Sequence, residues 1–183
     1  AIGDNQASVF GSTKFDNTVI INIGTGSQIS IPVNEYVEPP INCEIRPYVK
    51  GKYLLTGCAL CGGHSYSILK SFFNSILCSL NLDKDIQIDY SIMNKWAKQV
   101  LSNTTNNLPL FNTHFRGTRQ TPTLRASICN LDENNFTAPN ITFALLQGIC
   151  NELKDFYDKM IKLIPSTTFL VGTGNAIRLN TAL

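Results

Sequence analysis

Residues 17–33 read NTVIINIGTGSQISIPV, and this stretch decides the fold. Asn17–Ile23 is rich in Val and Ile, which is typical of a strand. Ser27–Val33 alternates apolar and polar residues, as a strand with one buried face does. The glycines of Gly24–Gly26 form a turn signal between the two runs. The stretch therefore predicts a β-hairpin closed by a Gly-Thr-Gly turn.

Segments on either side of the hairpin predict more strands and several helices. Runs of apolar and β-branched residues indicate strands at 43–49, 53–60, 126–131 and 167–171. Helical spacing indicates helices at 4–10, 64–80, 90–101 and 176–183, and a long helix capped by Thr137 with Pro139 in its first turn. We expect Ile68, Leu69, Phe72, Phe73 and Ile76 on the apolar face of the helix at 64–80, and a polar loop at 108–123. This order is typical of an α/β domain, a mixed sheet with flanking helices.

The bulk composition limits the classes of function. The chain has 183 residues, which is long enough for one sizeable domain. Of these residues 43% are apolar, an ordinary fraction for a globular protein. Its formal net charge is only +2 and it has no long basic cluster, which argues against a nucleic-acid partner. No apolar run has the length of a membrane span, and no secretory signal opens the sequence. We expect a cytoplasmic protein with neither a nucleic-acid nor a membrane partner.

Six cysteines lie mostly within apolar stretches, at positions 43, 58, 61, 78, 129 and 150. Thiols in such stretches are typical of buried positions in a reduced compartment. Cys58 and Cys61 have the spacing of a redox or zinc motif, but no second pair with that spacing is present. We therefore expect buried structural thiols and no residue that ligates a metal.

An acidic residue, Asp4, stands at a predicted helix start within the segment Gly3–Ser8. A carboxylate in such a place can accept the proton of a hydroxyl group that attacks a phosphate. Asp is also a common helix cap, and that use alone would account for it. The two roles are compatible, so both stay open at this point.

Three glycine-containing turns could approach a phosphate group. Gly24-Thr25-Gly26 closes the hairpin, Gly62-Gly63 precedes a helix, and Gly172-Thr173-Gly174 lies between a strand and a helix. Glycine lets the backbone come close to a ligand, and helix N-termini attract phosphate. Ordinary turn and loop geometry is the alternative for each turn taken alone. Together with Asp4, the three turns favour a phosphotransferase.

These segments, in this order, resemble the C-terminal domain of the FGGY carbohydrate kinases. The similarity begins with residues 3–8 and 21–28, continues through 60–63, 111–122 and 145–149, and ends at 171–176. It therefore covers nearly the whole chain. Within the family, Arg46–Tyr48 and Gly51–Leu54 are most similar to the members that convert sedoheptulose to sedoheptulose 7-phosphate.

The resemblance implies a ribonuclease-H-like domain of the actin/hexokinase type. It also implies transfer of the γ-phosphate of ATP, with Mg²⁺, to a sugar hydroxyl. By this resemblance, Asp4 matches the catalytic base and Asn5 matches a neighbour that touches the sugar. The nucleotide-binding residues it implies are Gly24, Thr25 and Gly26 in the hairpin turn, Gly62 and Gly63, and Gly172, Thr173 and Gly174 in the adenine-side loop.

The chain departs from the family pattern at three positions. Thr118 stands inside a usual Gly-Glu-Arg run, Cys61 replaces a common Asn, and Thr173 interrupts a glycine run.

We interpret residues 1–183 as the C-terminal, nucleotide-binding domain of a longer polypeptide. Its N-terminal domain would bind the sugar, so we expect little activity from this chain alone. The alternatives are another FGGY kinase, acting on xylulose, ribulose or glycerol, and a non-catalytic nucleotide-binding domain of the actin-like superfamily.

Overall fold

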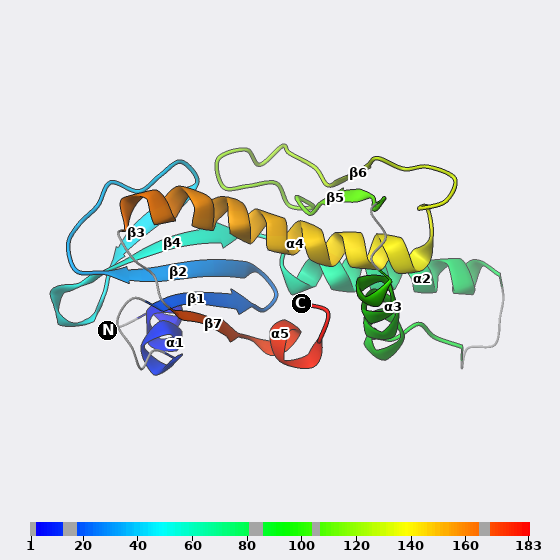
Figure 1. The fold of residues 1–183 in the computed structure, drawn as a ribbon, viewed down its shortest axis with the longest axis horizontal. Helices are drawn as coiled ribbons and strands as arrows, with labels where there is room; N and C mark the ends of the chain where they lie inside the picture. The colour runs from blue at the N-terminus through cyan, green and yellow to red at the C-terminus, as the bar shows by residue number, and fades with distance from the viewer. Residues whose placement is uncertain (1–2, 13–17, 81–85, 104–106, 165–168) are drawn as a thin grey trace.

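The computed structural model describes residues 3–12, 18–80, 86–103, 107–164 and 169–183 of the chain. Its centre is a five-stranded sheet in the order β3-β4-β2-β1-β7 (Figure 1). The strands are β1 (Thr18–Ile23), β2 (Ser27–Val33), β3 (Cys43–Pro47), β4 (Tyr53–Ala59) and β7 (Phe169–Thr173). β7 is parallel to β1, and the other neighbours are antiparallel. The sheet is therefore mixed, as the sequence predicts.

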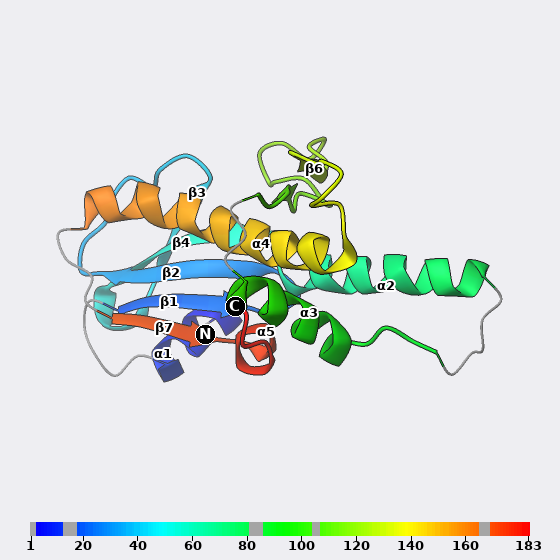
Figure 2. The ribbon, with the colours of Figure 1, turned by 45° about the vertical axis from the view of Figure 1, so that its right-hand side comes forward.

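Helices cover both faces of this sheet. α4 (Ala138–Met160) lies along one face, and α1 (Asp4–Ser12) lies on the other (Figures 1 and 2). The remaining elements are α2 (Gly63–Ser79), α3 (Tyr90–Ser102), α5 (Asn175–Leu179), the 3₁₀ turns η1 (Val49–Gly51) and η2 (Ile161–Leu163), and a small sheet of β5 (Leu110–Asn112) and β6 (Ser127–Cys129). α4 begins at the predicted cap, since the Thr137 side chain accepts a hydrogen bond from the Asn140 amide. The α/β architecture is thus confirmed.

The alternation of residues along the hairpin builds two cores. Ile29 and Ile31 in β2 are buried in the main core, to which α4 also contributes. Ile20 in β1 points to the opposite face and forms a smaller core with Leu54 and with Val9 of α1. Successive side chains of a strand point to opposite faces, so a shift of one residue would exchange the two sets. The predicted hairpin is confirmed, and its pattern fixes which face each helix covers.

α4 approaches β4 very closely at one point. A Cβ atom added at Gly57 would lie 2.4 Å from Cγ of Phe156, well inside van der Waals contact. Glycine at this position therefore lets the aromatic ring of Phe156 rest on the sheet backbone. This contact brings α4 close to the sheet.

The predicted apolar face of α2 is only partly correct. Leu69 and Phe73 are buried, but Phe72 is 55% exposed and Ile76 is 44% exposed. The C-terminal half of α2 extends beyond the end of α4 (Figure 2). Helical spacing marks an apolar face, but it does not show how far the neighbouring elements reach along it.

The expectation for the cysteines is also only partly correct. All six are free thiols, and Cys61 is buried, but Cys78, Cys129 and Cys150 are exposed. A short apolar run carries an exposed thiol when the residue lies on the outer side of its element. In the described residues, no helix combines the length and the apolar character that a membrane crossing requires.

Candidate functional site

The hairpin turn and the start of α2 are joined by backbone hydrogen bonds. The Gly62 amide donates to the Thr25 carbonyl oxygen over 3.0 Å, and the Gly63 amide donates to the Gly24 carbonyl oxygen over 2.8 Å. The His64 amide also donates to the Thr25 oxygen, over 3.0 Å. The two predicted glycine segments therefore come together at one end of the sheet.

Glycine is required on both sides of this contact. An added Cβ at Gly62 would lie 2.6 Å from the Gly26 carbonyl carbon, and one at Gly63 would lie 2.6 Å from the Gly24 oxygen. Because the first amides of α2 donate to the turn, they are engaged with the protein's own carbonyls. The structure therefore gives the glycine pair a role in close backbone packing.

The third glycine segment joins the same end of the sheet through β7. Gly172 and Thr173 pair with Ile21 and Asn22 of β1. Asn22 Nδ2 donates to Thr173 Oγ1 over 2.9 Å, which links β1 and β7 side chain to side chain. The backbone linking β7 to α5 then turns next to the end of β1.

Gly174 makes the turn between β7 and α5. Its φ is +95°, and an added Cβ would lie 2.5 Å from the Ile23 carbonyl oxygen. Only glycine adopts this conformation easily so close to another strand. The three predicted turns thus meet around the end of β1.

An apolar cavity of about 180 Å³ lies behind these turns. It is lined by Gly63 and Ala176, by Leu146 and Ile149 of α4, and by the rings of Tyr66 and Tyr90. The two rings stack with centroids 5.8 Å apart and planes inclined by 12°. Tyr66 Oη donates to Asn94 Oδ1 over 3.0 Å, and burial raises the Tyr66 pKa, so this hydroxyl stays protonated. Such walls suit a flat, largely apolar ring.

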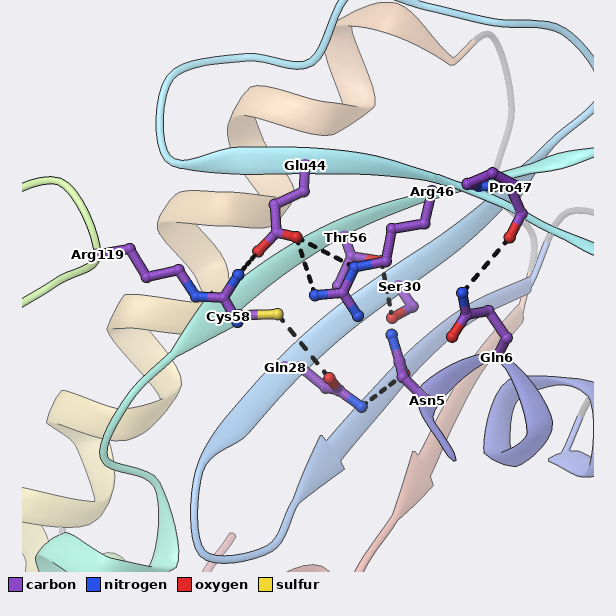
Figure 3. Close-up of polar contacts among 10 residues, drawn as sticks. All are labelled: Asn5, Gln6, Gln28, Ser30, Glu44, Arg46, Pro47, Thr56, Cys58 and Arg119. Atoms are coloured by element: carbon purple, nitrogen blue, oxygen red, sulfur yellow. Dashed lines mark hydrogen bonds and ion pairs between the residues drawn. The ribbon is translucent and has the colours of Figure 1, made fainter. Parts of the chain in front are cut away.

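A more polar cavity of about 280 Å³ lies on the other side of the hairpin turn. Residues of the turn line it, together with Gln28, Cys58 and Arg119. Arg119 forms an ion pair with Glu44, which also pairs with Arg46 over 2.9 Å (Figure 3). Two guanidinium groups therefore share one carboxylate close to the turn, which makes this corner favourable for an anion.

The start of α1 lies beside this polar cavity. Gln28 Nε2 of β2 donates to Asn5 Oδ1 over 2.6 Å, and Gln6 Nε2 donates to the Pro47 carbonyl oxygen over 3.5 Å (Figure 3). Asn5 Nδ2 is buried and has no hydrogen-bond partner among the residues that the structure describes. Asp4 is the first residue of α1, but its side chain lies outside the described part of the structure. The backbone of the predicted base is therefore placed near the hairpin, and its carboxylate is not described.

Within the described residues, no group of three His, Cys, Asp or Glu side chains is arranged to hold a metal ion.

Sequence analysis assigned no role to Asn22 or Gln28. The period-two pattern of β2 does place Gln28 on the polar face, which was the available signal for that residue. Asn22 reaches the site through its contact with Thr173, which is distant in the chain, and local sequence carries no such information.

No protein-family model matches the chain. Over its whole length the chain is 25% identical to mouse (Mus musculus) sedoheptulokinase, and it spans 39% of that protein. Among solved structures, xylulose kinase from Rhodospirillum rubrum matches all of the chain with a TM-score of 0.80 at 13% identity, over 35% of its own length. Glycerol kinase from Plasmodium falciparum, solved with ADP, matches 99% of the chain with a TM-score of 0.71 at 22% identity, over 35% of its length.

These comparisons confirm the expected actin/hexokinase-type fold, because the sugar-kinase structures match nearly every described element. Over its whole length the chain is therefore similar in sequence to a sedoheptulokinase, and its fold matches that of part of the solved sugar kinases.

Proposed function

We propose that the full-length protein is a kinase that transfers the γ-phosphate of ATP to a sugar hydroxyl. The observation that carries this proposal is the meeting of the three glycine turns around the end of β1, with the start of α1 beside them. A phosphotransferase needs a place for the nucleotide base, a place for the phosphates and a group that activates the hydroxyl. Each need has a matching feature at this end of the sheet.

In this proposal the adenine ring occupies the apolar cavity between α2 and α5. The phosphates then pass the turn formed by Gly24, Thr25 and Gly26, where the polar cavity and Arg119 would receive their negative charge. Neighbouring backbone segments approach each other closely at Gly62, Gly63 and the glycines of Gly172–Gly174, which have no side chains. This close approach shapes both cavities. Mg²⁺ would neutralise charge between the phosphates, held mainly by phosphate oxygens and water.

Asp4 is proposed as the general base. Its carboxylate would accept the proton of the sugar hydroxyl while that oxygen forms a bond to the γ-phosphorus and the bond to ADP breaks. Asn5, the next residue in α1, would contact the sugar. Support for this arrangement comes from the contact between Asn5 and Gln28, which holds the start of α1 beside the hairpin.

Sedoheptulose is the proposed sugar, giving sedoheptulose 7-phosphate. It rests on the similarity to mouse sedoheptulokinase, of which the chain spans 39%. Further residues of the full-length protein would form the N-terminal domain that completes the sugar site, so we propose that residues 1–183 alone have little activity. A cytoplasmic location is part of the proposal, and the six free cysteines support it.

The test is a phosphorylation assay of the full-length protein with ATP and Mg²⁺ on a panel of sedoheptulose, xylulose, ribulose and glycerol. Preferred turnover of sedoheptulose would support the proposal in full. Preference for another member of the panel would overturn the choice of sugar. Binding of ATP without phosphorylation of any polyol would favour the non-catalytic alternative.

A further inference from the structure

A chain of contacts beside the hairpin fixes the direction of two amide side chains. Gln28 and Cys58 are direct partners in the pairing of β2 with β4. Cys58 Sγ donates to Gln28 Oε1 over 3.9 Å, and Gln28 Nε2 donates in turn to Asn5 Oδ1 over 2.6 Å (Figure 3). Because Asn5 accepts through its oxygen, its NH₂ group remains for another partner.

The Cys58 thiol explains the direction of these two hydrogen bonds. Burial raises the pKa of the Cys58 thiol, although the nearby charge of Arg46 opposes the shift. The thiol therefore stays protonated at neutral pH and acts as a donor. An amide that faces a donor turns its oxygen toward it, so the NH₂ group of Gln28 faces α1.

Asn5 Nδ2 is the last atom in this series of hydrogen-bonding groups. The atom is buried and makes no hydrogen bond within the described part of the chain, although a buried amide donor normally has a partner. An acceptor atom that enters the site would satisfy it. Asn5 directly follows Asp4, the residue to which the proposed function assigns the proton transfer.

We propose that Gln28 is a positioning residue that presents Asn5 Nδ2 as a hydrogen-bond donor to a hydroxyl oxygen of the acceptor sugar. Cys58 holds Gln28 in the required direction. This inference rests on the proposed function and deepens it, because it names the atom that the sugar meets and the chemistry of that contact. The matching part of the substrate is an oxygen that can accept a hydrogen bond.

The first experiment uses the full-length protein and varies the sugar concentration at saturating ATP. Gln28→Met keeps much of the side-chain volume but removes both hydrogen bonds. We expect the KM for the sugar to rise on the order of tenfold and to rise much more than the KM for ATP, in a variant that still folds. Gln6→Met is the matched control, since Gln6 is the neighbour of Asn5 in α1 and its amide contacts the Pro47 carbonyl oxygen instead of Asn5. An unchanged sugar KM in Gln28→Met, or an equal rise in Gln6→Met, would overturn the inference.

A second pair of variants tests the thiol and does not depend on the folding of Gln28→Met. Cys58→Ala removes the donor, whereas Cys58→Ser keeps one. The sugar KM should rise in Cys58→Ala and rise less in Cys58→Ser; equal values in the two variants would refute the role of Cys58. If the wild-type protein turned over no sugar, the proposed function and this inference would fail together. Wild-type turnover with no KM change in these variants would overturn the inference alone.

Discussion

The Gly63 amide donates to the Gly24 carbonyl oxygen over 2.8 Å, and a Cβ added at Gly63 would lie 2.6 Å from that same oxygen. One short contact therefore joins α2 to the hairpin and excludes any side chain from the junction. Both cavities of the candidate site border this junction, so its geometry controls how the nucleotide would fit.

Gly63→Ala should weaken ATP binding. The new methyl group must push the hairpin turn away from α2, which distorts both proposed nucleotide cavities. We expect the Kd for ATP, measured by calorimetry on the full-length protein, to rise at least about tenfold. Gly11→Ala is the control, because an added Cβ at Gly11 meets no atom within 4 Å. Equal ATP affinity in the two variants would refute the role of the junction.

Asp4→Asn should lower kcat by orders of magnitude and leave ATP binding largely intact. An amide keeps the shape of the side chain but cannot accept the proton of the attacking hydroxyl. A coupled assay for ADP release measures kcat, and calorimetry measures ATP binding. Asp155→Asn, an exposed Asp of α4, serves as the control. Near-normal turnover in Asp4→Asn would remove Asp4 from the role of base.

Gly57→Ala should destabilise the fold by about 1–3 kcal/mol, because the methyl group overlaps the ring of Phe156. Phe156→Ala alone should cost about 3–5 kcal/mol, because the buried ring leaves a cavity. In the double variant the overlap with the ring atoms is gone and only the contact with Cβ of residue 156, at 2.6 Å, remains, so the combined cost should be smaller than the sum. Denaturant unfolding of the four proteins measures this coupling, and simple additivity would show that the two residues do not interact.

Glu152 makes stability depend on pH. Burial raises the pKa of its carboxyl group, while a hydrogen bond from Thr113 and the nearby His114 ring oppose the shift and Asp155 adds to it. A pKa raised in the folded state means that the folded protein binds the proton more tightly than the unfolded chain. The stabilisation that protonated Glu152 contributes is therefore complete when the pH is below the ordinary Glu pKa of 4.5, and it is lost as the pH rises through the raised pKa.

Glu152→Gln removes this titration. As the pH rises above 4.5, the free energy of unfolding of the wild type should fall relative to that of the Gln variant. Denaturant unfolding at a series of pH values measures the difference. Glu133→Gln, the same change at an exposed site, should show no such trend. A constant difference between wild type and Glu152→Gln across the series would contradict the assignment.

Much of the fold could be predicted because its signals are local. The hairpin follows from alternation and a glycine turn, and α4 follows from a cap at Thr137 and regular apolar spacing. The short strand β5 was missed within an expected loop, because the three residues of Leu110–Asn112 are too few for a periodic pattern. Exposure of Phe72 and Cys78 was missed because it depends on where neighbouring elements end.

The site was predictable in its parts and not in their connections. Glycine turns are visible in the sequence, since few other residues tolerate such backbone geometry. Their mutual contacts join residues far apart in the chain, as Gly63 with Gly24 does. Gln28 showed only a polar position in a strand, and its contact with Asn5 needs the packing of α1 on the sheet.

The pairing of β1 with β7 also has a consequence for how the protein is made. Asn22 and Thr173, which hydrogen-bond to each other, are separated by 151 positions. During synthesis, one edge of β1 stays unpaired until its partner strand β7 has also left the ribosome. Contacts of such long range form late and slowly, and an unpaired strand edge can associate with other chains in the meantime. Expression conditions that keep the number of unfinished chains low should therefore improve the yield of folded protein.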